Sequence, residues 1–189
     1  MSLSYRVTLQ VQEVVSADDK TVHQLDLRDI LGEDDMKDLL KQSLEERGFE
    51  EEEDGKLVRR EGSGEVITVD MESLQLTTEL ESSSEVSGKV DAWGDAESRG
   101  SARRQAEASA QRQANSIIER GQKDIQSKVT EQLAKGEKDR LEEMHQTLQD
   151  VYAEALKRKA RQMGDVVDQY EGTNENGEYE LVIKVEVPE

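Results

Sequence analysis

The feature that most constrains the fold of this chain is a proline-free stretch of about 70 residues, which begins at residue 95 or 101 and ends near residue 170. Within it, apolar residues recur every three to four positions, first from Ala106 to Leu133 and then from Leu141 to Ala155. A neighbouring stripe follows from Tyr152 to Tyr170. This spacing is typical of an α-helix with one apolar face, so the sequence predicts a coiled-coil-like helical section over residues 95–171.

Gly136 is the one candidate break in this section. The chain either folds back there as a helical hairpin, whose two apolar seams cover each other, or continues as a single helix. A continuous helix of about 70 residues would be roughly 105 Å long at 1.5 Å per residue and would need a partner. Acidic residues stand four positions before basic ones, as in Glu131 and Lys135, which supports a solvated helix surface in either case.

The first 94 residues have the character of a small α/β module. Alternating or β-branched segments predict strands at residues 5–11, 21–27, 66–71, 74–80 and 86–93. Gly32 and the acidic residues after it open a short helix that ends at Gly48, and Asp54-Gly55 indicates a hairpin turn. We expect Ser82–Ser84 to break the strand before it. We expect Trp93, where the sheet gives way to the helix, to fill the core.

The clearest strand pattern lies at the end of the chain, where Tyr179–Val187 follows the turn signal Asn176-Gly177. A strand of this quality needs a sheet, and the nearest is the N-terminal one. The sequence therefore predicts an α+β fold with a small, mostly antiparallel sheet and one short helix. The predicted domains are an acidic α/β module (1–94), the helical section (95–171) and a C-terminal strand (172–189) that rejoins the sheet of the module.

The composition limits the size of the core and the class of protein. Apolar residues make up 33% of the 189 residues and aromatic residues only 3%, which fits a narrow apolar seam better than a large core. The net charge of −19 favours solubility and repels nucleic acid, and the basic cluster Arg99, Arg103, Arg104 and Arg112 has no aromatic residue among it. No apolar run is long enough to span a bilayer, and no secretory leader or cysteine occurs. We therefore expect a cytoplasmic bacterial protein.

No motif for catalysis or cofactor binding is present. The chain has no nucleophile elbow, no phosphate-binding loop and no dinucleotide fingerprint, so no cofactor is expected. Glu142 and His145 form one Glu-x-x-His motif, the spacing used in di-iron helices, but such a site requires two motifs and two further glutamates. These two residues are weak candidates for metal ligands, and an exposed polar helix face is the favoured interpretation.

The pattern favours a non-enzymatic assembly or adaptor protein over an enzyme. In this interpretation the helical section binds a protein partner or a second copy through helix–helix contacts. The architecture is similar to that of accessory proteins found beside bacterial ATPases and proteases, although no motif identifies a family. Two alternatives stay open: a small acidic enzyme or a ligand- or metal-binding protein that uses carboxylates, and an acidic mimic of nucleic acid. The predicted interaction residues are Ile118, Ile125, Leu133, Leu141, Leu148, Val151 and Leu156.

Overall fold

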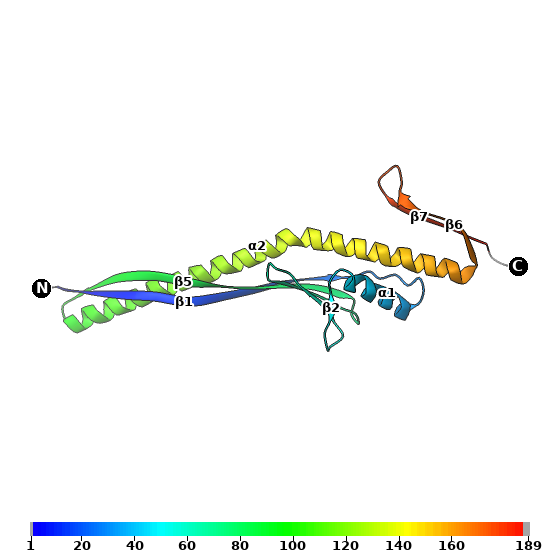
Figure 1. The fold of residues 1–189 in the computed structure, drawn as a ribbon. Coiled ribbons are helices and arrows are strands. Elements are labelled where there is room, and N and C mark those ends of the chain that lie inside the picture. The colour runs from blue at the N-terminus through cyan, green and yellow to red at the C-terminus, as the bar shows by residue number, and fades with distance from the viewer. Residues whose placement is uncertain (1, 187–189) are drawn as a thin grey trace. The chain divides into compact units, whose positions relative to one another are not determined.

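The computed structural model describes residues 2–186 and has an α+β fold (Figure 1). Its elements, in chain order, are β1 (Leu3–Gln24), α1 (Glu33–Glu45), β2 (Glu50–Glu51), β3 (Leu57–Arg60), β4 (Glu65–Asp70), β5 (Gln75–Ala96), α2 (Arg99–Met163), β6 (Asp165–Thr173) and β7 (Tyr179–Glu186). Strands β1 to β5 form one sheet in the order β1-β5-β4-β3-β2. The predicted fold class, a small sheet with one short helix and a long helical section, is confirmed.

The chain divides into two compact units that each have their own core. Unit 1 consists of Met1–Thr21, Gly62–Glu65 and Glu79–Lys135. Unit 2 consists of Val22–Glu61, Val66–Thr78 and Gly136–Glu189. Strands β1 and β5 and helix α2 each contribute residues to both units, and the boundary within α2 falls at Gly136.

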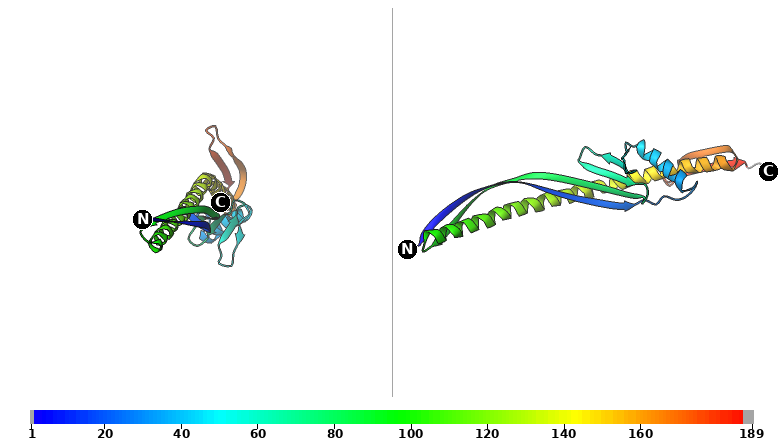
Figure 2. Two further views of the ribbon diagram at one scale, coloured as in Figure 1. Left: turned by 90° about the vertical axis from the view of Figure 1, so that its left-hand side faces the viewer. Right: turned by 90° about the horizontal axis from the view of Figure 1, so that it is seen from below.

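In unit 1, α2 lies along one face of the ribbon formed by β1 and β5 (Figure 2). The helix presents small side chains at its beginning, and Ala102 and Ala106 are fully buried. The opposing strand position is Gly94, where an added Cβ atom would lie 2.7 Å from the backbone nitrogen of Ala106. The helix and the strand therefore approach closely because neither has a large side chain at the contact. The strand β5 also runs through Ser82–Ser84, so the expected break at these serines is wrong.

Trp93 does not fill the core, which corrects the expectation from the sequence. Its neighbours Ala92 and Gly94 are buried, and alternation along β5 therefore turns the tryptophan to the opposite face. The indole is 59% exposed there, and the guanidinium carbon of Arg6 lies 5.5 Å from the centre of the ring. Arg6 also forms an ion pair with Asp91, at 2.9 Å, across the two strands.

The core of unit 2 joins α1, the strands and the second half of α2. The four apolar residues of α1 that share one face, Met36, Leu39, Leu40 and Leu44, are all buried, as their spacing predicts. They belong to one apolar cluster with Phe49 and with four residues of helix α2: Met144, Leu148, Val151 and Ala155. These four residues of the apolar seam of α2 are therefore covered by the chain itself.

The helical section is one continuous helix, so the alternative of a helical hairpin that turns at Gly136 is wrong. A glycine inside a helix costs about 1 kcal/mol relative to alanine. Packing offsets this cost on both sides, because Leu133 is buried in the core of unit 1 and Met144 in the core of unit 2. The helix ends at Met163, earlier than the predicted residue 171.

The C-terminal segment forms a separate hairpin, which corrects the predicted pairing of the last strand. A strand is present at Tyr179–Glu186, as predicted, and Val187 lies outside the described residues. This strand, β7, pairs antiparallel with β6 rather than with the N-terminal sheet, and the two form a sheet of their own. The partner was missed because residues 165–171 were assigned to the helix.

A bidentate ion pair between Arg59 and Glu143 fixes α2 to the sheet of unit 2. Nη1 and Nη2 of Arg59 on β3 donate to the two carboxylate oxygens of Glu143, at 2.6 and 2.8 Å. Arg59 also lies 4.7 Å from the centre of the Phe49 ring. The hydrogen bonds from Arg59 lower the pKa of Glu143 below its usual value, and this effect exceeds the opposing effect of partial burial.

We expect Glu143→Gln to reduce the free energy of unfolding at pH 7 by about 1–2 kcal/mol, because a charge-assisted pair is lost at a partly exposed site. A carboxylate with a lowered pKa in the folded state stabilises the protein above the unfolded pKa and loses this contribution as the pH falls through the folded pKa. The difference in the free energy of unfolding between Glu143→Gln and the wild type, measured by urea unfolding, should therefore be smaller at pH 3.5 than at pH 7. An equal difference at both pH values would contradict the stabilising role of the Arg59–Glu143 ion pair. The control is Glu142→Gln, which removes the neighbouring, exposed carboxylate.

Candidate protein-interaction groove

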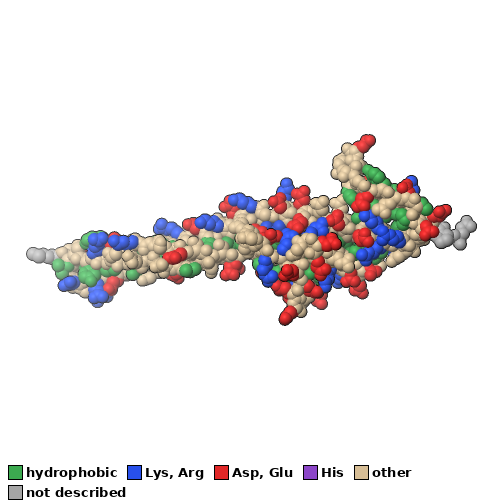
Figure 3. Space-filling model, viewed as in Figure 1, with side chains coloured by type: hydrophobic (Ala, Val, Ile, Leu, Met, Phe, Trp, Pro, Cys, Tyr) green, Lys and Arg blue, Asp and Glu red, His purple; other side chains and the backbone are tan. Residues whose placement is uncertain are grey.

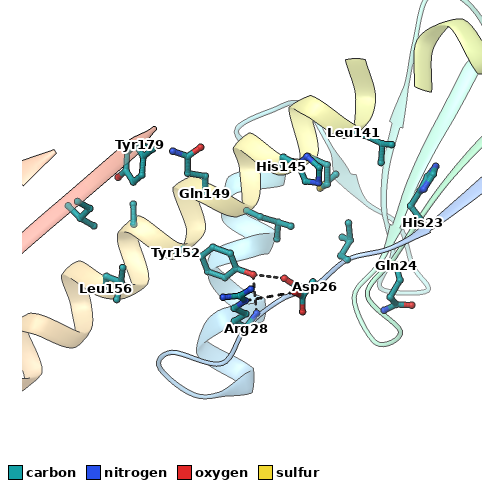
Figure 4. A pocket seen from close by; sticks show the side chains of 15 residues that line it. His23, Gln24, Asp26, Arg28, Leu141, His145, Gln149, Tyr152, Leu156 and Tyr179 are labelled. Atoms are coloured by element: carbon teal, nitrogen blue, oxygen red, sulfur yellow. Dashed lines mark hydrogen bonds and ion pairs between the residues drawn. The ribbon is translucent and has the colours of Figure 1, made fainter. Parts of the chain in front are cut away.

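An open apolar groove lies in unit 2 over the second half of α2 (Figure 4). The helix provides the floor, including Leu141, Leu148 and Leu156. One wall is the end of β1 and the segment that follows it, residues 23–28, and the other wall is β7, with Tyr179 and Leu181. The hollow has a volume of about 560 Å³. It therefore combines one helix face with two segments that are far apart in the sequence.

The groove continues toward the end of α2. A second hollow of about 430 Å³ is lined by the last turns of the helix and by one face of β7. Leu156 and Leu181 line both hollows, so the two form one groove. The remaining lining residues of the second hollow are mostly apolar: Lys159, Ala160, Met163, Ile183 and Val185.

Tyr152 fixes the first wall to the helix. Its hydroxyl oxygen accepts a hydrogen bond from the backbone N–H of Arg28, at 3.0 Å, and its O–H donates to the backbone carbonyl of Asp26 (Figure 4). At the upper end of the same wall, His23 pairs with Glu137 on α2, with 2.9 Å between Nε2 and Oε1. These contacts hold the segment after β1 at the edge of the groove.

A network of three polar side chains fixes the second wall. Lys157 on α2 donates to Glu171 on β6 at 2.6 Å, and the hydroxyl of Tyr179 donates to the same carboxylate at 2.9 Å. The hydrogen bond from Lys157, and then that from Tyr179, lowers the pKa of Glu171. Partial burial, followed by the hydrogen bond to Glu171, raises the pKa of Tyr179 to about 12. The phenol therefore stays protonated, and the carboxylate charged, throughout the neutral pH range.

Exposed apolar surface is concentrated at this end of unit 2. Seven of the eleven large apolar residues that are exposed within residues 2–186 lie between positions 156 and 182. They are Leu156, Met163, Val166, Val167, Tyr170, Tyr179 and Val182. Apolar side chains are visible around the β6–β7 hairpin in Figure 3. A cluster of exposed apolar residues on an otherwise highly charged protein is typical of a protein-binding surface.

The structure divides the seven predicted interaction residues between the core and the groove. Ile125 and Leu133 are buried in the core of unit 1, where they pack with Val15, Ala17 and Leu80, and Ile118 is partly buried beside them. Leu148 and Val151 are buried in the core of unit 2. Only Leu141, which is half-buried, and Leu156, which is 43% exposed, keep surface available in the groove. The role of these residues in binding a partner stays a prediction.

The weak metal candidates Glu142 and His145 are both exposed on α2, and they line different hollows. His145 lines the groove, whereas Glu142 faces a shallow hollow with Arg47 and Asp150. Within residues 2–186, no group of three or more histidine, aspartate or glutamate side chains is arranged to hold a metal ion.

Several groove residues were not found from the sequence. Tyr179, Leu181 and Ile183 were assigned to the N-terminal sheet, and the first wall depends on long-range contacts. One local signal was available, because Gly164 and the β-branched pair Val166-Val167 precede the turn at Asn176-Gly177, as expected of a hairpin.

The chain is therefore an α+β protein with an open apolar groove in unit 2. It belongs to the family described as FtsH ternary system domain X5, whose model matches residues 1–187. No curated protein and no solved structure matches the chain. The family description assigns the domain to a system of several components. No helix within residues 2–186 combines the length and the apolar character needed to cross a bilayer.

Proposed function

We propose that this protein is a non-enzymatic adaptor that binds another component of the FtsH ternary system through the groove of unit 2. The observation that carries the proposal is the groove itself, whose floor is an apolar face of α2 with no covering segment among the described residues. The family description supports a role among several proteins. The occupant that we propose is an amphipathic helix of a partner, which would pack lengthwise on α2.

The lining of the groove favours binding over catalysis. Leucine, methionine and tyrosine side chains make up much of it, and tyrosine and methionine are enriched at protein interfaces. The hydroxyls of Tyr152 and Tyr179 already form hydrogen bonds that hold the two walls. The polar groups of the groove therefore serve to fix its shape, and the apolar floor provides the contact area.

The test is binding of the full chain to each purified component of the FtsH ternary system, measured by analytical ultracentrifugation. We expect Leu156→Asp to raise the dissociation constant at least tenfold, because a carboxylate would be desolvated at the centre of an apolar contact. Leu156 is 43% exposed, so the variant should keep the fold, which circular dichroism checks.

The matched control is Val14→Asp, which introduces the same charge at a residue of β1 that is 68% exposed and lies in unit 1. Its dissociation constant should stay within about twofold of the wild type, as for an exposed site outside the interface. Equal binding by the wild type and Leu156→Asp would exclude the groove as the docking site. Failure of the wild type to bind any component would overturn the adaptor role.

A small apolar ligand is a second candidate occupant, because the first hollow of about 560 Å³ has the size of a small-molecule site. A thermal-shift scan with apolar metabolites separates the two. A ligand that raises the melting temperature of the wild type but not that of Leu156→Asp would favour this second function.

A further inference from the structure

The strand β7 has one edge that no other strand pairs with in the described part of the chain. The hairpin it forms with β6 is a sheet of two strands only. Isolated two-stranded hairpins are marginally stable in water, and an apolar strand with an open edge is a template for a further strand. The sequence of β7 is rich in β-branched and aliphatic residues, with Leu181, Val182, Ile183 and Val185 in close succession.

The hydrogen bonds of the hairpin define which backbone groups point to the open edge. The backbone N–H of Asn174 donates to the carbonyl of Glu178 at 2.8 Å, which makes these two residues a hydrogen-bonded pair. Hydrogen-bonded and non-hydrogen-bonded pairs alternate along antiparallel strands. From the observed register, the backbone groups of Val182, opposite Tyr170, therefore point to β6, and those of Leu181 and Ile183 point to the open edge.

The open edge of β7 is complementary to itself when a second copy is placed antiparallel with Val182 opposite Val182. In this register Glu180 of each copy lies opposite Lys184 of the other, and Leu181 lies opposite Ile183. Cross-strand pairs of opposite charge stabilise a sheet, and apolar side chains that face each other across two strands bury apolar surface. Leu181 and Ile183 would form the hydrogen-bonded pairs, which agrees with the direction of their backbone groups in the hairpin.

The rows across such a four-stranded sheet are consistent with the contacts inside each hairpin. Lys184 already pairs with Asp168 on β6 at 2.8 Å. In the dimer it would lie between this carboxylate and that of Glu180 from the second copy. Tyr170 lies opposite Val182 on the outward face, and 51% of the tyrosine is exposed. The sheet would continue this row as tyrosine, valine, valine and tyrosine, which would give the exposed ring of Tyr170 a longer apolar surface to pack on.

The other edge of the hairpin, formed by β6, is not complementary to itself in the register centred on Asp168. If two copies of β6 paired about Asp168, this carboxylate would face itself, and Asp165 would face Glu171. Like charges directly opposite each other destabilise a strand pair. In these two registers the charge pattern favours pairing through β7 and opposes pairing through β6.

We infer that this protein forms a symmetric homodimer by edge-to-edge pairing of β7 with β7 of a second copy, centred on Val182. This interface uses the backbone edge of β7, whereas the groove uses the side chains of Leu181 and Ile183 on one face of the same strand, and its proposed occupant is a different protein. The inference therefore stands or falls independently of the proposed adaptor role.

A charge-swap experiment tests the pairing. Sedimentation equilibrium of the full chain should show a dimer, and Glu180→Lys should weaken it about tenfold because lysines then face each other in both symmetric positions. Lys184→Glu should weaken it similarly. An equimolar mixture of Glu180→Lys and Lys184→Glu should form a heterodimer, because every cross-strand pair then joins opposite charges. Glu175→Lys, which makes the same charge change in the turn between β6 and β7, is the control.

A cysteine probe tests the register directly, since the chain contains no cysteine. Residues that face each other in a non-hydrogen-bonded pair have Cα atoms about 4.5 Å apart, within the range of disulfides. Val182→Cys should therefore form a covalent dimer on mild oxidation, whereas the exposed Val14→Cys should not. A wild type that stays monomeric at 100 µM, a dimer that Glu180→Lys does not weaken, or equal cross-linking of the two cysteine variants would each overturn the inference.

Discussion

Leu148→Asp is expected to lower the melting temperature by about 10 °C or more, because the loss of a buried leucine and the burial of a carboxylate together cost about 4 kcal/mol or more. Leu148 is 8% exposed and belongs to the same apolar cluster as Leu40 of α1 and Phe49. The new carboxylate would have no partner in this cluster, so it would be desolvated or forced to take up a proton.

The concentration dependence of this effect distinguishes an intramolecular seam from an intermolecular one. The contacts of Leu148 lie within unit 2, so the loss of helix content and of melting temperature should be the same at 1 µM and at 100 µM. Leu156→Asp is the matched control, two helical turns further along α2, and it should change the free energy of unfolding by no more than about 1 kcal/mol because 43% of this residue is exposed to solvent. Recovery of the fold at high concentration would mean that the seam of α2 is closed by a second copy.

The short helix α1 could be predicted from the sequence because its signals are local. Acidic residues follow Gly32, and the apolar residues from Met36 to Leu44 repeat with the period of a helix. The signals that predict this element lie within its 13 residues or directly beside them. The local pattern alone therefore predicts the buried face of α1, and the structure confirms it.

The strand β6 was assigned to the preceding helix because its apolar residues also fit helical spacing. Met163, Val167 and Tyr170 are four and three positions apart, so they continue the stripe of α2. The deciding interaction is the pairing with β7, which lies beyond the turn at Asn176-Gly177. The error at β6 then left β7 without its partner, and the N-terminal sheet was chosen in its place.

The groove was predictable only in its floor. Leu141 and Leu156 were selected because they repeat with the seam of α2, and both line the groove. Nothing in that spacing distinguishes them from Val151, which is buried in the core of unit 2 together with residues of α1. The covered and uncovered parts of one helix face differ only in which distant segments pack on them, so periodicity alone overestimates the free surface.

Gly94→Ala is expected to reduce the free energy of unfolding by about 3 kcal/mol, the upper end of the range for overpacked sites. The Cβ atom would lie 2.7 Å from the backbone nitrogen of Ala106 and closer still to the carbonyl oxygen of Ala102. Both contacts are to the backbone of α2, which cannot turn aside as a flexible side chain can. The helix would have to move away from β5, and the buried alanines of the contact would lose their packing.

The matched control is Gly100→Ala, at the beginning of α2, where an added Cβ atom meets no other atom within 4 Å. Alanine is preferred to glycine in a helix, so this variant should be stabilised by about 0.5–1 kcal/mol. Hydrogen exchange measured by mass spectrometry locates the effect. In Gly94→Ala, peptides from the first turns of α2 should lose protection, whereas peptides around Val151, in the core of unit 2, should keep it. Unchanged protection near Ala102 and Ala106 would mean that the close contact of β5 with α2 does not hold unit 1 together.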